Sequence, residues 1–266
     1  MLREAESWRV SPETLALVDR TAARLQPDDP ALAPWFDGYV REHRSRFAAD
    51  LRLVERYVAR GARLLEYGAI PLVTTAALSS LGYHVRALDV RPARFARSIA
   101  ALGLDVASCD VETAPVPYAS ASFDAVLFNE LLEHLRINPV FTLREARRVL
   151  RPGGRLLLST PNLRSFRGLA NLLFSDRALT ASGGVYEQYE KLETIGHMGH
   201  VREYTAREVS ELLSRSGFEV EALVFRGGHG AGLVGLAERL APAWRPFFTV
   251  VASRRPDDAT DGDGFR

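Results

Sequence analysis

The feature that most limits how this chain can fold is an alternation of short apolar segments with helical segments, which begins at residue 63. The apolar segments, expected to be buried strands, are Arg63 to Tyr67, His84 to Asp89, a stretch near Val106, Phe123 to Asn129 and Arg155 to Ser159. The segments expected to be helices are Val73 to Leu81, Arg91 to about Leu102, and about Thr142 to Leu150. Repeated strand–helix units of this length predict a parallel sheet with right-handed crossovers, and therefore an α/β domain.

Three segments lie outside this alternation. Residues 1–60 are expected to form an N-terminal helical cap, because Ser11-Pro12 is typical of a helix start and apolar residues recur at helical spacing up to Gly61. Residues 161–203 have no clear period and are too long for a plain loop, so we expect an insertion that covers the substrate side after the fifth strand. The main domain is expected to span 61–253, and the polar tail 254–266 is expected to be disordered.

Length and charge narrow the function classes. A chain of 266 residues can bury the core of one such domain. Its formal net charge of +1 lacks the basic surface of a nucleic-acid-binding protein. Cys109 is the sole cysteine, so no internal disulfide forms. Met1 to Val10 lacks the apolar run of a signal peptide, and no stretch approaches the roughly 20 apolar residues of a membrane span, so we expect a cytoplasmic protein.

Polar residues follow the expected strands, where an open parallel sheet binds its ligands. These segments are Glu66-Tyr67-Gly68-Ala69-Ile70-Pro71, Asp89-Val90, Cys109-Asp110-Val111 and Asn129-Glu130. Asp89 lies 23 positions beyond Glu66, a spacing at which a carboxylate accepts hydrogen bonds from ribose hydroxyls. The sequence therefore predicts a nucleotide-like cofactor at this edge of the sheet.

These segments resemble the motifs of class I S-adenosylmethionine-dependent methyltransferases, from about residue 60 to 160 and more loosely to 253. Glu66 and Gly68 match the start of the family's E/D-x-G-x-G-x-G motif, Asp89 matches its ribose-binding acid, and Asp110 matches the acid near the adenine amino group. FDAVLFNELLEHL (123–135) and LREARRVLRPGGRLLLSTPN (143–162) are similar to the family's fourth- and fifth-strand regions.

The resemblance implies a Rossmann-like, seven-stranded, mostly parallel sheet flanked by helices, with its last strand antiparallel at or beside the edge. It also implies S-adenosylmethionine as cofactor. The residues expected to bind it are Glu66, Gly68, Ala69, Pro71, Asp89, Val90, Asp110, Val111, Asn129 and Glu130.

One departure concerns the glycine motif, whose second and third glycines are replaced by Ile70 and Leu72. Either the loop follows a variant path, with Ile70 directed into the core, or the site is decayed and the protein is a non-catalytic binding or scaffold subunit. Retention of Glu66, Asp89 and Asp110 favours the variant path. A nicotinamide dehydrogenase fits poorly, because only Gly68 of its G-x-G-x-x-G motif is present.

Histidines supply the candidates for a general base. His134 follows the fourth strand and His200 ends the insertion, and both are expected at the methyl-accepting side of the cleft. The residues expected to bind the acceptor are Asn162, His197, Arg202 and Tyr204. The structural alternatives are that His134 is hydrogen-bonded within the fold, that His200 anchors the insertion, and that Arg202 and Tyr204 pack it.

A histidine-rich pocket suits deprotonation of a hydroxyl, so O-methylation is expected. The resemblance favours a small-molecule, sugar or lipid-linked acceptor over nucleic acid, and the oligomeric state stays open. A metal site built from Glu133, His197 and His200 is conceivable, but the spacing lacks the specificity of recognised metal motifs, so no metal is expected.

Overall fold

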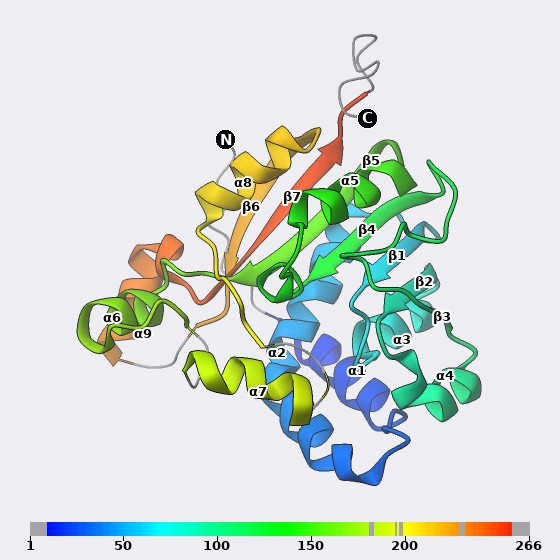
Figure 1. The fold of residues 1–266 in the computed structure, drawn as a ribbon, viewed down its shortest axis with the longest axis horizontal. Helices are drawn as coiled ribbons and strands as arrows, with labels where there is room; N and C mark the ends of the chain where they lie inside the picture. The colour runs from blue at the N-terminus through cyan, green and yellow to red at the C-terminus, as the bar shows by residue number, and fades with distance from the viewer. Residues whose placement is uncertain (1–9, 181–183, 195, 197–198, 229–231, 257–266) are drawn as a thin grey trace.

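The protein is described by a computed structural model that covers residues 10–180, 184–194, 196, 199–228 and 232–256. Seven strands form one sheet in the order β3-β2-β1-β4-β5-β7-β6 (Figure 1). Their bounds are β1 Arg63–Tyr67, β2 His84–Asp89, β3 Asp105–Ser108, β4 Phe123–Asn129, β5 Leu150–Pro161, β6 Phe218–Arg226 and β7 Phe247–Arg254. β7 pairs antiparallel with β5 and β6, beside the edge, and the other pairs are parallel. The expected Rossmann-like sheet is confirmed.

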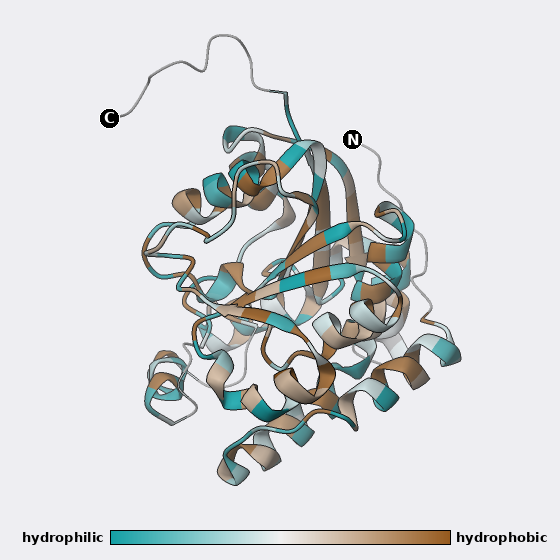
Figure 2. Ribbon diagram, turned by 90° about the vertical axis from the view of Figure 1, so that its right-hand side faces the viewer, coloured by the Kyte–Doolittle hydropathy of each residue, from teal (hydrophilic) through white to brown (hydrophobic). Residues whose placement is uncertain are grey.

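Helices cover both faces of this sheet. Their bounds are α1 Pro12–Ala22, α2 Ala33–Tyr57, α3 Val73–Ser80, α4 Ala96–Leu102, α5 Pro139–Val149, α6 Phe166–Ser175, α7 Val185–Thr194, α8 Ala206–Arg215 and α9 Gly232–Leu240. Figure 2 shows hydrophobic strands at the centre, with helices of mixed character around them. Among these helices, none combines the length and the apolar character that crossing a membrane requires.

Alternation of side chains along each strand divides the core into two layers. Leu64 packs with residues of α1, α2 and α3, whereas the next residue, Leu65, packs with residues of α5 and α8. Successive residues of a strand point to opposite faces, so a strand covered by helices on both faces reads as a continuous apolar run. This explains why the buried strands were recognisable from the sequence.

The segments outside the alternation differ partly from expectation. Ser11 caps α1 as predicted, accepting a hydrogen bond from the Thr14 backbone N–H. The structure places α6 and α7 within residues 161–203. β5 begins at Leu150, earlier than expected, because this residue already pairs with Phe123 of β4 before a register shift. β7 continues through Arg254, which donates to the Leu150 carbonyl at 2.5 Å, so this first residue of the expected disordered tail is ordered. Residues 257–266 lie outside the described part of the chain.

Candidate active site

A cleft of about 300 Å³ lies at the carboxyl ends of β1, β2 and β4 and next to β3. This volume is at the lower end of the range for small-molecule sites. The predicted cofactor residues that line it are Gly68, Asp89, Val90, Asp110, Val111 and Glu130, and of the predicted bases His134 lines it as well. The topology therefore gathers side chains from four strand ends around one hollow.

Asp89 is fixed at the end of β2 by backbone hydrogen bonds. Its Oδ2 accepts from the Ile70 N–H at 3.1 Å and its Oδ1 from the Arg91 N–H at 2.9 Å. Burial raises the pKa of the Asp89 carboxyl, although these N–H groups act in the opposite direction. A carboxylate oxygen accepts two hydrogen bonds, so each Asp89 oxygen retains capacity for a ligand hydroxyl.

The turn between β1 and α3 shows how the chain replaces the missing glycines. Gly68 has a φ of 66°, and a Cβ at this position would lie 3.2 Å from the Leu131 side chain. Leu72 has a φ of 70° and is fully buried in the core, so it holds the left-handed conformation that favours glycine at a cost of about 1–2 kcal/mol. Ile70 packs partly against the core and also borders the cleft. The Ile70 side chain is therefore partly packed in the core, as the variant path predicts, and partly at the cleft, as the decayed site predicts.

Four predicted cofactor residues stand behind the cleft lining. Glu66 is buried and accepts a hydrogen bond from Thr75 of α3, and burial raises its pKa to about 8. Ala69 is 3% exposed and donates to the Leu88 carbonyl, and Pro71 is buried. Asn129 accepts from Ser159 Oγ at 3.2 Å. These contacts hold the strand ends and the turn in place, and the structure does not bring these four residues to the cleft surface.

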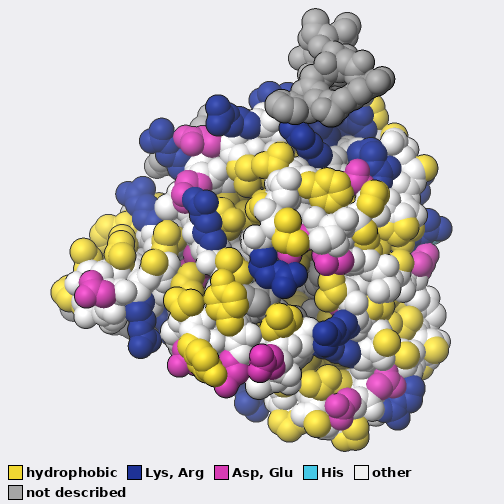
Figure 3. Space-filling model, viewed as in Figure 1, with side chains coloured by type: hydrophobic (Ala, Val, Ile, Leu, Met, Phe, Trp, Pro, Cys, Tyr) yellow, Lys and Arg dark blue, Asp and Glu magenta, His cyan; other side chains and the backbone are white. Residues whose placement is uncertain are grey.

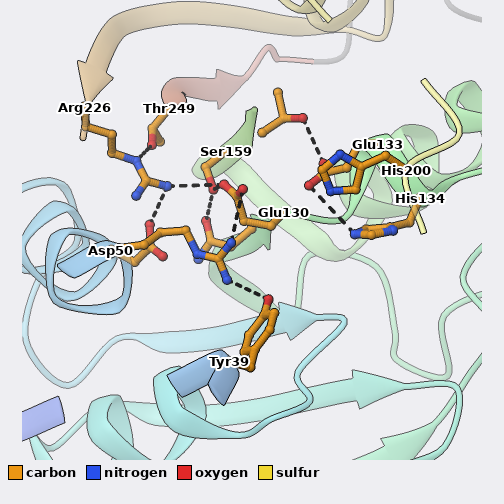
Figure 4. Close-up of polar contacts among 12 residues, drawn as sticks. Tyr39, Asp50, Glu130, Glu133, His134, Ser159, His200, Arg226 and Thr249 are labelled. Carbon is orange, nitrogen blue, oxygen red and sulfur yellow. Dashed lines mark hydrogen bonds and ion pairs between the residues drawn. The ribbon is translucent and has the colours of Figure 1, made fainter. Parts of the chain in front are cut away.

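A buried ionic network backs the cleft at Glu130 (Figure 4). Glu130 Oε1 accepts from Ser159 Oγ at 2.8 Å, and its carboxylate faces Arg46 at 3.4 Å and Arg226 at 3.5 Å. Arg226 also pairs with Asp50 of α2 at 2.8 Å. The side chains of Arg226 and Asp50 are 2% and 3% exposed. Opposite charges at this depth fix α2 to the ends of β4 and β6.

Sequence reasoning missed several residues of the cleft lining, among them an aromatic pair and an arginine pair. Trp35 and Tyr39 of α2 line the cleft, and Tyr39 accepts a hydrogen bond from Arg46 at 2.6 Å. The spacing of four residues between them places both on one helix face, so it was a usable signal. Arg91 and Arg94, which follow β2, also line the cleft. Burial lowers the pKa of Arg94, and the neighbouring Arg91 charge adds to this effect.

The two predicted bases meet beside the cleft (Figure 4). The rings of His134 and His200 lie edge to face, with centroids 5.0 Å apart. His134 Nδ1 is 3.0 Å from the Gly199 carbonyl, and His200 Nδ1 is 2.7 Å from Glu203 Oε1. Burial lowers the pKa of His200, but the hydrogen bond to Glu203 and the nearby carboxylates outweigh burial and raise it.

The structure does not bring the other predicted acceptor residues to the cleft. Asn162 is buried and donates to the Ala243 and Arg245 carbonyls. Arg202 pairs with Glu208 at 2.9 Å and stacks on Tyr204, and both border a separate surface hollow next to α8. These side chains therefore fix both ends of the insertion to the domain, Asn162 at its start and Arg202 and Tyr204 at its end. His197 lies outside the described residues.

Comparisons with known proteins agree with this geometry. A methyltransferase-domain family model matches residues 40–223, more than half of the chain. A Mycolicibacterium smegmatis protein named "Probable S-adenosylmethionine-dependent methyltransferase" is 38% identical over 128 residues, covering 47% of this chain and 40% of that protein. A ubiquinone biosynthesis O-methyltransferase of Xanthomonas oryzae is 35% identical over 107 residues, covering 38% of this chain and 44% of its own. The chain thus spans less than half the length of these curated relatives.

Solved structures share the fold. A methyltransferase dependent on S-adenosylmethionine from Mesorhizobium loti has a TM-score of 0.55 and 22% identity, covering 77% of this chain and 96% of that chain. One from Thermotoga maritima has a TM-score of 0.56 and 17% identity, covering 84% of this chain and 97% of that chain. With the motif spacing, the strand order and the family match in agreement, the chain belongs to the class I S-adenosylmethionine-dependent methyltransferases.

Proposed function

We propose that this protein transfers a methyl group from S-adenosylmethionine to a hydroxyl group of a small-molecule, sugar or lipid-linked acceptor. The observation that carries the proposal is the pair His134 and His200, which lies beside a cleft built from the ends of β1, β2 and β4. The Xanthomonas relative named as an O-methyltransferase supports transfer to oxygen.

The residues of the cleft fit the cofactor. Asp89 is held by two N–H groups with acceptor capacity left for two ribose hydroxyls, and Gly68 offers a backbone without a side chain at the turn. Asp110, next along the lining, is suited to accept from an adenine amino group. When bound, the cofactor supplies a methyl group already activated on a sulfonium sulfur. What the protein must add is alignment of the acceptor and a dry pocket.

On the acceptor side, the histidines have the arrangement of a base with an orienting partner. The Glu203 carboxylate accepts from His200 Nδ1–H and so leaves the Nε2 lone pair for a proton. His134 reaches the cleft itself, with its side chain 26% exposed. Either ring is suited to accept the proton of a hydroxyl placed in line with the methyl group.

A second candidate function is a non-catalytic scaffold, which is favoured by the Ile70 side chain at the edge of the cleft. Titration calorimetry with S-adenosylhomocysteine separates the two functions. We expect binding by the wild-type protein and a loss of about 2 kcal/mol, or roughly 30-fold, in Asp89→Ala, the scale of hydrogen bonds to a charged group. No binding at millimolar ligand would favour the scaffold.

His200→Ala tests the acceptor side. We expect a 10²- to 10⁴-fold lower single-turnover rate with nearly unchanged S-adenosylhomocysteine affinity, because the imidazole acts on the acceptor. His84→Ala, an exposed histidine at the start of β2, is the matched control. A parallel loss of melting temperature and acceptor binding, at an unchanged single-turnover rate, would mean that His200 only anchors the insertion.

A further inference from the structure

Three potential metal ligands converge beside the cofactor cleft (Figure 4). Glu133, His134 and His200 each offer one ligand atom, and the three atoms lie within 4.8 Å of one another. Glu133 and His134 come from the turn after β4, whereas His200 comes from the end of the insertion, 66 positions later. The trio differs from the one considered from sequence, because the structure brings His134 to the cluster.

The hydrogen bonds around the cluster fix the tautomers of its two histidines. A carbonyl oxygen only accepts, so the contact of His134 Nδ1 with the Gly199 carbonyl requires a proton on Nδ1. The contact of His200 Nδ1 with the Glu203 carboxylate sets the same tautomer. In each neutral ring, Nε2 then carries the lone pair. Histidines that ligate a metal show this pattern, in which the second ring nitrogen donates to a carboxylate or a carbonyl.

Glu133 gives the second, independent observation. Its side chain is 1% exposed, and its Oε2 accepts from Thr160 Oγ1 at 2.8 Å. Within the described part of the chain, its Oε1 has no hydrogen-bond partner and lies 3.9 Å from His134 Nε2. A buried carboxylate oxygen without a hydrogen bond is costly unless a ligand satisfies it.

We propose that Glu133, His134 and His200 bind one divalent first-row transition-metal cation, of the kind that prefers imidazole and carboxylate ligands, and that this cation holds the hydroxyl of the acceptor. Two histidines and one carboxylate leave open positions for water or substrate. Neighbouring ligands around tetrahedral zinc lie about 3.3 Å apart, from metal–ligand distances near 2.05 Å. Binding therefore draws the most separated ligand atoms together by about 1.5 Å relative to the 4.8 Å limit.

The role of the cation in holding the acceptor hydroxyl rests on the proposed function. In this role the metal activates the hydroxyl in place of a histidine base. The cation lowers the pKa of the hydroxyl, so that the O–H bond breaks and its proton passes to solvent. The oxygen lone pair forms the new O–CH₃ bond, and the electron pair of the broken C–S bond stays on sulfur, leaving S-adenosylhomocysteine. His134 and His200 then act as ligands, and not as bases.

The test is equilibrium dialysis of chelator-treated protein against Co²⁺ and, separately, Zn²⁺, with metal analysis. We expect one equivalent per chain, visible absorption from bound Co²⁺, a higher melting temperature with Zn²⁺, and loss of this equivalent in Glu133→Gln and His134→Ala. Glu203→Gln is expected to lower the affinity for Co²⁺ by about 10- to 100-fold, as loss of a supporting hydrogen bond does. His84→Ala, at the exposed start of β2, is the control and should bind like wild type.

His134→Ala guards the test against misfolding, because this side chain is partly exposed and its removal leaves no buried charge. Absence of stoichiometric metal, or metal retained in both Glu133→Gln and His134→Ala, would overturn the site. Full methyl transfer by chelated protein would overturn the role of the cation in activating the hydroxyl. Failure to bind S-adenosylhomocysteine would instead refute the proposed function, whatever the result with metal.

Discussion

Glu66 makes the stability of this protein depend on pH in a direction opposite to that of most carboxylates. It lies beneath the cleft turn, 5% exposed, with a hydrogen bond from Thr75. Burial raises its pKa from an ordinary 4.5 to about 8, and the nearby carboxylates of Asp50 and Asp89 add to the shift. Between these pH values the folded protein keeps a proton that the unfolded chain has released, so the free energy of unfolding falls as pH rises.

The magnitude follows from the size of the shift. The slope approaches 1.4 kcal/mol per pH unit between the two pKa values, and the full effect is on the order of 3–5 kcal/mol by pH 8.5. Glu66→Gln keeps a neutral acceptor for Thr75 but removes the titration. We therefore expect wild type and variant to be similar in stability near pH 5, and the variant to be more stable by several kcal/mol at pH 8.5.

Urea unfolding of both proteins at half-unit steps from pH 5 to 8.5 measures this difference. Taking the difference between the two curves cancels the titration of the other buried acids. Glu219→Gln, at an exposed position of β6, controls for the loss of one surface carboxylate and should run parallel to wild type. Parallel curves for wild type and Glu66→Gln would refute a buried, protonated Glu66.

Two further predictions concern buried residues behind the lining of the cleft. Leu72→Gly should relieve about 1–2 kcal/mol of left-handed strain but lose about 2–5 kcal/mol of core packing. Urea unfolding should therefore show a net loss of stability, with S-adenosylhomocysteine affinity unchanged. A more stable variant would show that the strain outweighs the packing. Arg226→Met should cost about 3–5 kcal/mol of unfolding free energy, because it removes the buried partner of the Asp50 carboxylate and leaves Glu130 with Arg46 alone. The exposed Arg207→Met should cost almost nothing, and equal stabilities of the two variants would contradict the network.

The strands were predictable because a parallel sheet covered on both faces leaves continuous apolar runs in the sequence. Helices α6 and α7 were not predicted, because residues 161–203 as a whole show no clear period. The buried residues are Gly168 in α6 and Gln188 in α7, whereas Leu173, Phe174 and Tyr186 are more than two thirds exposed. Figure 3 shows hydrophobic side chains on the part of the molecule that projects to the left, where Figure 1 places α6 and α9. Apolar residues at helical spacing are present in α6, but they form an exposed stripe and not a core-facing one.

The presence of acidic residues at the strand ends was predictable, but the alternation of side chains along a strand was not used to decide which of them point into the cleft. Residues two apart in a strand share a face, and Leu64 packs toward α3. Glu66 therefore also points toward α3, where it meets Thr75, and not into the cleft. Asp89, at the last position of β2, instead meets the N–H groups of the two adjacent turns and borders the cleft. The meeting of His134 with His200 depends on the path of the insertion, which local patterns do not encode.

The departure from the glycine motif is compatible with a cofactor site because other parts of the fold fix the position of the cleft wall. Leu72 keeps the left-handed turn at the cost of strain, and its side chain gains a fully buried position in the core. Glu130, itself at a φ of 50°, is held from behind by Arg46 of α2 and by Arg226, which pairs with Asp50 of α2. The same Arg46 donates to Tyr39, which also lines the cleft. Core packing thus holds the turn at Leu72, and buried ion pairs hold the neighbouring strand end at Glu130, so the fold keeps a left-handed position at this turn without a glycine.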